Sequence, residues 1–364
     1  MRSKVRAVDS TATPYEEGRR LALAEKERLG ARSRWLGNLR GVSFAAFVIG
    51  TATWIFGSSS TGGIVGALGF IAFVVLVVLH GPVIEAEEHA ERLALVNEHA
   101  LARSRGEFAD LPETGEMPAG HAYAGDLDLF GRGSLYQRLS VAHTHFGKDT
   151  LSSWLARFAP LDEIAARQEA VRELAAALDF RREFEASSLA LSQKRRNGRI
   201  EVAPSPNPEP LLAWIEEPAE ILGRTWLVVA AFVFPLITLS GIALHASGRG
   251  SPLHWIAPLL VQLALLAHTA RVSTRAFTAV SSTEGAFLRY GRLLDLIETF
   301  AARAPWLLDR QARLSEKTPS SGASSRQASR SMRRFRSLVG WLDLRHNGMV
   351  YPFIDALLLW AIHS

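Results

Sequence analysis

The chain has 364 residues, enough for two or three domains of ordinary size, and 48% of them are apolar. Its formal net charge is +5 and arginine far outnumbers lysine, which makes anionic lipid or nucleic acid a candidate partner, since guanidinium groups bind phosphate well; a cytoplasmic positive-inside bias is the alternative explanation. The absence of cysteine excludes disulfides, thiolate metal sites and cysteine nucleophiles.

Residues 1–41 are predicted to form a basic, cytoplasmic N-terminal helix, because 15–40 has a charged helical pattern. The first apolar run begins only at residue 42, too far from the N-terminus for a signal peptide. The basic residues that precede this run are Arg19, Arg20, Lys26, Arg28, Arg32, Arg34 and Arg40.

Four apolar runs without Lys, Arg, Asp or Glu are predicted to cross a membrane, at 42–57, 62–80, 225–246 and 253–270. They pair into two transmembrane hairpins, 42–80 and 225–270, with short polar tips at 58–61 and 247–252. Buried helices of a soluble protein are the alternative. Pro235 should kink the third span.

Gly62 and Gly66 have the GxxxG spacing of a helix-packing face, although glycine is also common in membrane helices. The first tip has no positive charge and the second has only Arg249. The positive-inside rule therefore predicts a multi-pass protein of the inner (cell) membrane with both tips outside and both termini in the cytoplasm.

Residues 81–122 are predicted to be a charged helix and a linker. The helix at 82–105 has opposite charges four residues apart, such as Glu88 and Arg92, which suits a solvated helix. Glu85 and His89 could share a metal at the same spacing, but no second ligand pair stands nearby, so a charged surface is favoured. The linker is rich in Pro and Gly.

Residues 123–224 are predicted to be a helical region, with helices over 134–190, a turn at Gly147, and a basic turn followed by a Pro-rich connector at 194–210. Residues 271–364 are predicted to be a further helical region, with amphipathic helix over 276–315 and a low-complexity segment at 316–329. Arg326, Arg330 and Arg334 would then form one helical stripe. The expected fold class is mainly α, with a helical body interrupted by the two hairpins.

Residues 123–185 resemble the core (lever) region of the MutS family of DNA mismatch-repair proteins, in particular its membrane-anchored MutS-like subgroup, and the resemblance covers this core region only. The family pattern is a Leu-(Asp/Glu)-Leu-Phe strand end, a Gly-Ser-Leu, a turn with a Gly, a Leu-x-x-Trp-Leu helix and an Ile-x-x-Arg helix that ends in Glu-Leu. The matching residues are Leu127, Asp128, Leu129, Phe130, Gly133, Ser134, Leu135, Gly147, Leu151, Trp154, Leu155, Ile164, Arg167, Glu173 and Leu174. The last fifty residues resemble the helical return that precedes the family's ATPase domain. Packing alone is the alternative explanation for these residues. Trp154 and the leucines would then be core residues, and Arg167 and Glu173 would connect helices through ionic contacts.

The motifs of nucleotide chemistry are missing from this sequence. A MutS ATPase needs GxxxxGK(S/T), and the nearest string, "FGKDT" at 146–150, lacks the upstream glycine and has Asp149 after Lys148, so Lys148 is interpreted as a surface charge. The mismatch-reading domain with its Phe-x-Glu wedge is not found either. His143 and His145 are two residues apart and are expected in a turn or on the surface rather than as ligands. No catalytic group, metal site or cofactor is predicted, and ATP with Mg²⁺ would enter only through an ATPase domain supplied elsewhere.

Three hypotheses follow. The chain could be a membrane-anchored MutS-like core that binds DNA backbone or acts as a scaffold related to mismatch repair; an integral membrane interaction protein without a nucleic-acid role; or the first part of a MutS-like ATPase whose remaining domain would begin near residue 364. The predicted partners are the lipid bilayer, DNA, a second copy in a homodimer, as the family resemblance implies, or a separate ATPase subunit. The candidate contacts to nucleic-acid or anionic-lipid phosphate are Arg195, Arg196, Arg199, Arg330, Arg333, Arg334 and Arg336.

Overall fold

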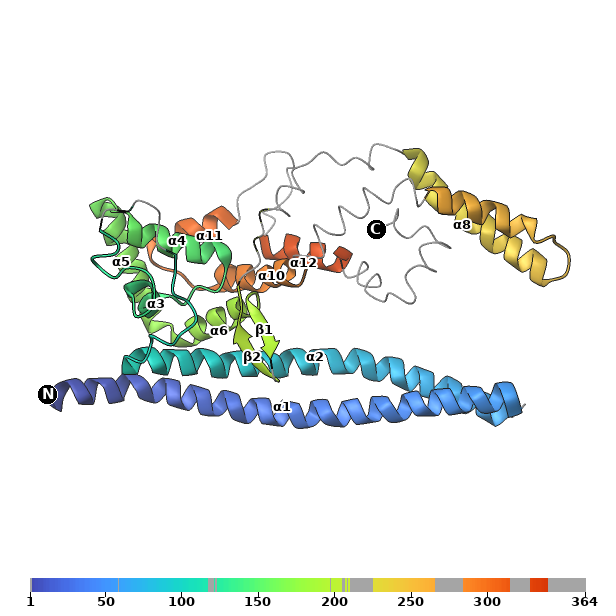
Figure 1. The fold of residues 1–364 in the computed structure, drawn as a ribbon, viewed down its shortest axis with the longest axis horizontal. Coiled ribbons are helices and arrows are strands. Elements are labelled where there is room, and N and C mark those ends of the chain that lie inside the picture. The colour runs from blue at the N-terminus through green and yellow to red at the C-terminus, as the bar shows by residue number, and fades with distance from the viewer. Residues whose placement is uncertain are drawn as a thin grey trace. The chain divides into compact units, whose positions relative to one another are not determined.

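The protein is mainly helical in the computed structural model, which confirms the mainly α part of the expected fold class (Figure 1). The structure describes residues 2–57, 59–116, 121, 123–196, 198–204, 207, 209, 225–265, 284–314 and 328–339. It divides into two compact units: residues 1–205 with 302–306, and residues 206–301 with 307–364.

Two long antiparallel helices form the spine of the first unit, α1 (Arg2–Gly57) and α2 (Ser60–Arg105). They lie side by side over most of their length (Figure 1). Ser59 caps the start of α2, because its Oγ accepts a hydrogen bond from the Gly62 amide at 3.3 Å. Gly106 ends α2 in the left-handed conformation, with φ of +82°, as is usual at a helix C-terminus. The boundary predicted at 41/42 falls inside α1, because no helix-breaking signal separates the charged part from the apolar part.

Short helices and a β-hairpin pack on the C-terminal, charged half of α2, and the hairpin lies about midway along the spine (Figure 1). The helices are α3 (Leu135–Leu139), α4 (His145–Ala156), α5 (Leu161–Ala176) and α6 (Leu178–Leu189). The antiparallel hairpin consists of β1 (Gln193–Arg196) and β2 (Arg199–Val202), with Arg195 opposite Ile200. Val96 of α2 packs with Ala186 and Leu189 of α6 in one buried cluster, to which Val202 of β2 also contributes.

The charged half of α2 is not the solvated helix that its charge pattern suggested. Glu88 and Arg92 do form the expected pair, with 3.8 Å between Nη1 and Oε2, but Arg92 is almost completely buried. Packing of α1 on one side of α2, and of α6 and the hairpin on another, explains this burial. Opposite charges four residues apart therefore marked buried, paired positions here rather than a water-exposed face.

The second unit contains an apolar helix pair and a second helical region. The pair consists of α8 (Thr225–Ala246), which runs through Pro235, and the helix at Leu253–Leu265. The other region contains α10 (Glu284–Thr299) and α12 (Ala328–Val339), which pack together. Helix α11 (Pro305–Leu314) begins in the first unit and continues in the second. Residues 266–283, 315–327 and 340–364, with Arg326 and most of the predicted low-complexity segment, lie outside the described residues.

Within the described part of the chain, one helix, α2, is long and apolar enough to cross a membrane by length and composition. Two further apolar helical stretches, Phe232–His245 and Leu253–Leu265, are shorter. The structure thus supports membrane association at this coarse level. It does not bear out the four predicted spans, because only one described helix is long and apolar enough, and the orientation of the hairpins stays a prediction.

Candidate membrane interface and basic face

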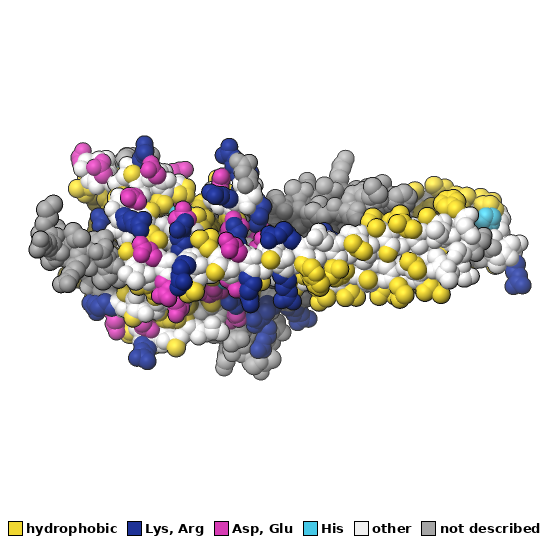
Figure 2. Space-filling view, turned by 90° about the horizontal axis from the view of Figure 1, so that it is seen from below, with side chains coloured by type: hydrophobic (Ala, Val, Ile, Leu, Met, Phe, Trp, Pro, Cys, Tyr) yellow, Lys and Arg dark blue, Asp and Glu magenta, His cyan; other side chains and the backbone are white. Residues whose placement is uncertain are grey.

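The paired ends of α1 and α2 present apolar side chains outward. Charged residues are absent from 41–57 of α1 and from 60–84 of α2, so each helix is apolar on all faces over this length. Figure 2 shows the resulting apolar surface, which begins where the mixed charges of the spine end. The exposed large apolar residues here are Val42, Phe44, Val48, Ile49, Trp54, Phe56, Ile64, Val65, Leu68, Phe70, Ile71, Val74, Val75, Val77, Val78, Leu79 and Ile84.

Glycines hold these two helix ends in close contact. A Cβ on Gly50 would lie 2.4 Å from the amide nitrogen of Gly66, and one on Gly62 would lie 2.4 Å from Oγ1 of Thr53. A Cβ on Gly69 would lie 2.6 Å from the backbone nitrogen of Phe47. The GxxxG spacing of Gly62 and Gly66 therefore does mark a packing face, one turned toward α1 of the same hairpin. Aromatic pairs continue this interface, with Phe47 and Phe70 at 5.3 Å between ring centroids.

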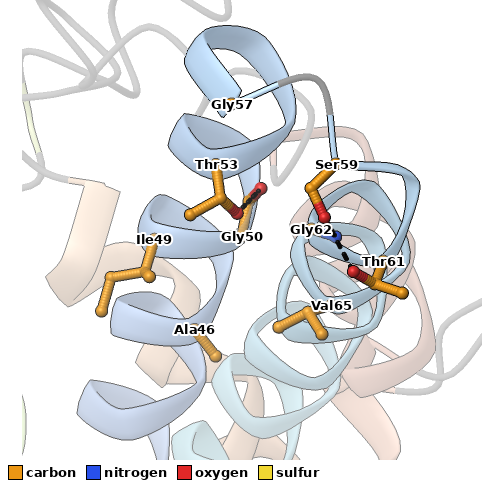
Figure 3. Close-up of a pocket in the computed structure, with 9 residues that line it drawn as sticks. All are labelled: Ala46, Ile49, Gly50, Thr53, Gly57, Ser59, Thr61, Gly62 and Val65. Carbon is orange, nitrogen blue, oxygen red and sulfur yellow. Dashed lines mark hydrogen bonds between the residues drawn. The ribbon is translucent and has the colours of Figure 1, made fainter.

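A shallow groove lies between the two helices at the tip (Figure 3). Its nine lining residues are small, apolar or hydroxyl-bearing: Ala46, Ile49, Gly50, Thr53, Gly57, Ser59, Thr61, Gly62 and Val65. The hydroxyls are engaged locally, as Thr53 Oγ1 donates to the Gly50 carbonyl at 3.0 Å and Ser59 Oγ lies 2.7 Å from Thr61 Oγ1. None of the nine has an ionisable side chain, so the three hydroxyls have no general base beside them among the residues that line the groove.

The second apolar pair is joined by a buried polar contact. Thr238 Oγ1 lies 3.0 Å from Oε1 of Gln262 and 3.0 Å from the Phe234 carbonyl, so its one proton serves two acceptors, and the side chains of Thr238 and Gln262 are fully buried. Close backbone packing accompanies it, because a Cβ on Gly241 would lie 2.5 Å from the carbonyl oxygen of His254. Buried hydrogen bonds between apolar helices favour one register, and they are typical of helix pairs in lipid.

The residues that carry the MutS resemblance form the outer body of the first unit. Leu129 and Phe130 are buried with Tyr136, and Leu151 and Leu155 pack against them. Burial raises the pKa of Tyr136 above its ordinary value. The expected strand end at 127–130 is wrong: the segment is a turn, with Asp128 at φ of +47°. Leu127 and Leu135 are exposed.

This turn continues through two glycines with positive φ, Gly131 at +100° and Gly133 at +76°. Ser134 then caps α3, because its Oγ accepts from the Gln137 amide at 3.2 Å. Gln137 belongs to no motif in the sequence and was not predicted to have a role. Its buried amide donates to the carbonyls of Ala109 and Leu111 and accepts from the Gly133 amide, which fixes the linker to the turn.

Gly147 and Lys148 do not have the environments predicted from the sequence. Gly147 is in the first turn of α4 and not in a turn between helices, because Thr144 caps that helix by accepting from the Gly147 amide at 3.1 Å. Lys148 is not a free surface charge, since its Nζ lies 2.7 Å from Oε1 of Glu113 and both side chains are largely buried.

Trp154, Arg167 and Glu173 connect elements of the body. Trp154 is 40% exposed and so is not a core residue; the Arg167 guanidinium lies over its ring at 4.0 Å, and Trp306 approaches it at 6.1 Å. Arg167 also pairs with Glu163 in its own helix. Glu173 does tie helices: its carboxylate accepts from the backbone amides that precede α11, at 2.8 Å from Arg303 and 2.6 Å from Ala304.

A buried polar cluster joins α2, α6 and the loop before α4. Arg103 donates to the Ser140 carbonyl at 2.6 Å and lies 3.9 Å from Oε1 of Glu185, which is 3.6 Å from Nε2 of His143. Burial, and then the charge of Arg103, lowers the pKa of His99 to about 4. His143 lies in the loop between α3 and α4 and is 2% exposed, so the expected surface position is wrong. His145 begins α4 and lies 3.3 Å from Asp149.

The metal alternative at Glu85 and His89 is not supported. Glu85 lies 3.4 Å from Arg92, while His89 lies 2.9 Å from Glu183. Among the described residues, no group of three or more His, Asp or Glu side chains is arranged to hold a metal ion.

The candidate phosphate-binding arginines of the hairpin have different environments. Arg195 is engaged by acidic side chains, at 3.4 Å from Glu88 and 3.5 Å from Glu91. Arg196 and Arg199 flank the turn of the hairpin and are exposed.

The remaining candidate arginines belong to α12. Arg330, Arg333 and Arg334 are all exposed, and Arg333 pairs with Asp295 at 3.0 Å. Arg330 and Arg334 are four residues apart. Arg336 is within α12, but its side chain lies outside the described residues. Ser329 anchors the start of this helix, because its amide donates to Glu298 at 3.0 Å.

Comparisons with protein-family models, curated proteins and solved structures find no match to this chain.

Proposed function

We propose that this chain is a membrane-anchored helical scaffold protein, in which two apolar hairpins cross the bilayer and hold an arginine-rich helical body at its cytoplasmic face. One observation carries the proposal. In the most apolar stretch of α2, only 17% of the residues are buried, whereas the core helix of a soluble protein would be mostly buried. Soluble monomers rarely expose apolar patches beyond ~600 Å².

The dimensions of the first hairpin agree with a bilayer. At about 1.5 Å per residue, the charge-free part of α2 is about 37 Å long, which is sufficient for the ~30 Å hydrocarbon core. The apolar part of α1 is shorter, at about 24 Å, and arginine side chains at its end can extend toward the interface. The hydroxyl-rich tip would face the outside, and the basic part of the spine would face the cytoplasm.

The MutS-like resemblance suggests what the body does. In this proposal the helices of residues 134–190 correspond to the lever region of that family, and they position a partner rather than carry out chemistry. A lever needs helices that move as one rigid body. The hydrogen bonds of Glu173 and Gln137 and the Arg103–Glu185 ion pair hold neighbouring elements together and would provide such rigidity. A nucleotide-hydrolysing domain would have to be supplied to it.

Extraction of native membranes tests the anchor. The full chain should sediment with membranes, stay there after washing with alkaline carbonate or with high salt, and be released only by detergent. Recovery of a compact monomer in the soluble fraction without detergent would overturn the proposal. Release by salt or carbonate alone would show peripheral attachment, which contradicts the spanning hairpins.

A second candidate function is contact with the phosphate backbone of nucleic acid, and α12 favours it. Its exposed Arg330 and Arg334 are four residues apart and so lie on one helical face, and Arg330, which has no carboxylate within 4 Å among the described residues, can form bidentate contacts with phosphate. The full chain in nanodiscs of neutral lipid should then bind duplex DNA with an affinity that falls steeply with salt, and less steeply after Arg330→Gln with Arg334→Gln. Equal binding by the wild type and this variant would show that α12 does not contact the DNA backbone.

A further inference from the structure

Basic side chains are unevenly partnered along α1. Toward its N-terminal end they are paired with acids: Arg19 with Glu98 at 3.4 Å, Lys26 with Glu91 at 2.9 Å. The three arginines nearest the apolar stretch, Arg32, Arg34 and Arg40, have no carboxylate within 4 Å among the described residues. Arg32 and Arg34 are exposed and Arg40 is half-buried.

The β-hairpin repeats this contrast. Arg195, which lies over α2, is held by acidic side chains, but Arg196 and Arg199 at the turn are exposed and make no ion pair with the described residues. We name the five unpaired arginines, Arg32, Arg34, Arg40, Arg196 and Arg199, the basic collar.

Contacts between the two antiparallel helices show where the collar lies along the spine. Ser33 Oγ is 3.0 Å from Nε2 of His80, and Lys26 contacts Glu91. Arg32 and Arg34 therefore lie beside the end of the charge-free part of α2, and Arg40 lies about 10 Å nearer the tip. The hairpin rests on Glu88 and Glu91, roughly 6–10 Å farther along α2 than its last apolar residues.

This position matches the headgroup layer of a bilayer. Each headgroup region is about 5–8 Å thick outside the hydrocarbon core, and an arginine side chain is long enough to bridge the remaining distance. Figure 2 shows Lys and Arg side chains gathered where the apolar surface begins. Acidic side chains are absent from 28–57 of α1 and from 60–84 of α2. The next acids on α2 are Glu85, which pairs with Arg92, and Glu87, which forms no ion pair with a collar arginine among the described residues.

We propose that the basic collar binds the phosphate groups of anionic phospholipids in the leaflet next to the helical body. Guanidinium groups form bidentate hydrogen bonds with phosphate oxygens, and an exposed arginine without a carboxylate is free to do so. The inference rests on the proposed membrane anchor and deepens it, because it assigns the lipid class and the residues that recognise it. Each juxtamembrane arginine should raise the affinity for an anionic surface about fivefold at most.

The test uses the full chain reconstituted in nanodiscs, with spin-labelled phosphatidylglycerol and phosphatidylcholine as competing probes of the lipid that contacts protein. The collar variant replaces all five collar arginines by glutamine. The charge-matched control replaces five exposed arginines that each contact a carboxylate: Arg19, Arg20, Arg28, Arg310 and Arg313. Circular dichroism verifies that both variants keep their helical content.

The wild type and the control should prefer phosphatidylglycerol, and the collar variant should lose at least two-thirds of that preference. Equal preferences in all three proteins, or an equal loss in the control, would overturn the proposal. Duplex DNA binding to neutral nanodiscs that disappears in the collar variant would also overturn it, since the partner would then be nucleic acid. A chain that fails to insert refutes the anchor itself, whereas insertion without lipid preference refutes only the collar.

Discussion

Glu91 connects three elements, and its removal should loosen all of them. Its carboxylate accepts from the Ile200 amide of β2 at 3.3 Å, pairs with Lys26 of α1 at 2.9 Å and approaches Arg195 of β1 at 3.5 Å. A hydrogen bond to a charged group contributes about 1.5–3 kcal/mol, and a half-exposed ion pair contributes up to about 1 kcal/mol. Glu91→Ala should therefore cost about 3 kcal/mol of stability in this joint.

Hydrogen exchange on the full chain in nanodiscs measures that loss. A cost of about 3 kcal/mol should accelerate exchange in the peptide 193–203 by roughly a hundredfold, since each 1.4 kcal/mol is tenfold. Glu98→Ala is the control, because Glu98 is on the same helix and pairs with Arg19 while largely exposed, so it should change exchange less than about fivefold. Similar exchange in the two variants would refute the view that Glu91 holds the hairpin on the spine.

Three further predictions concern the apolar hairpins and the buried histidine. Gly50→Ala should destabilise the chain by about 1–3 kcal/mol in a detergent melt, because its Cβ would clash with the α2 backbone. The control Gly41→Ala, whose Cβ would meet nothing within 4 Å, should be neutral or stabilising by under ~1 kcal/mol. A larger loss of stability in Gly41→Ala than in Gly50→Ala would contradict the packing face. Thr238→Val should lower stability by about 0.6–2 kcal/mol, since it leaves buried Gln262 without the threonine donor; an unchanged melt would show that the bond contributes nothing. His99, with a pKa lowered to about 4, is neutral in the folded state, so stability should be full above pH ~6.5, the unfolded value, and fall by up to about 3 kcal/mol as the pH drops to 4. His99→Gln should flatten this slope in melts at pH 7, 5.5 and 4.5, and an equally steep slope in the variant would assign it to other groups.

Periodicity and composition were sufficient for the helices. Uncharged apolar runs and helix caps such as Ser134 and Thr144 are formed by residues close together in the sequence. The helical class and most helix positions could therefore be predicted from the sequence. The β-hairpin was not predicted, although the Asn-Gly between Arg196 and Arg199 is typical of a hairpin turn. Only the turn was predicted there, because the flanking segments are short and basic and do not have the composition of strands.

Burial of charged residues could not be predicted, because it depends on contacts between distant segments. Lys148 reaches Glu113, His143 reaches Glu185, and Arg92 is covered by elements that follow it by about a hundred residues. The same limit applies to the candidate arginines. Arg195 and Arg196 are neighbours with the same chemistry, yet the alternation of side chains along β1 turns only the first toward the acids of α2.

The sidedness of the hairpins tests the central claim most directly, and the absence of cysteine makes it accessible. Single cysteines placed by Thr61→Cys at the first tip and Glu98→Cys in the body are labelled with a membrane-impermeant maleimide on intact cells and again after permeabilisation. The account predicts that the tip cysteine reacts in intact cells and the body cysteine reacts only after permeabilisation. Equal reactivity at both positions before permeabilisation, or no reaction at the tip until the membrane is opened, would contradict it.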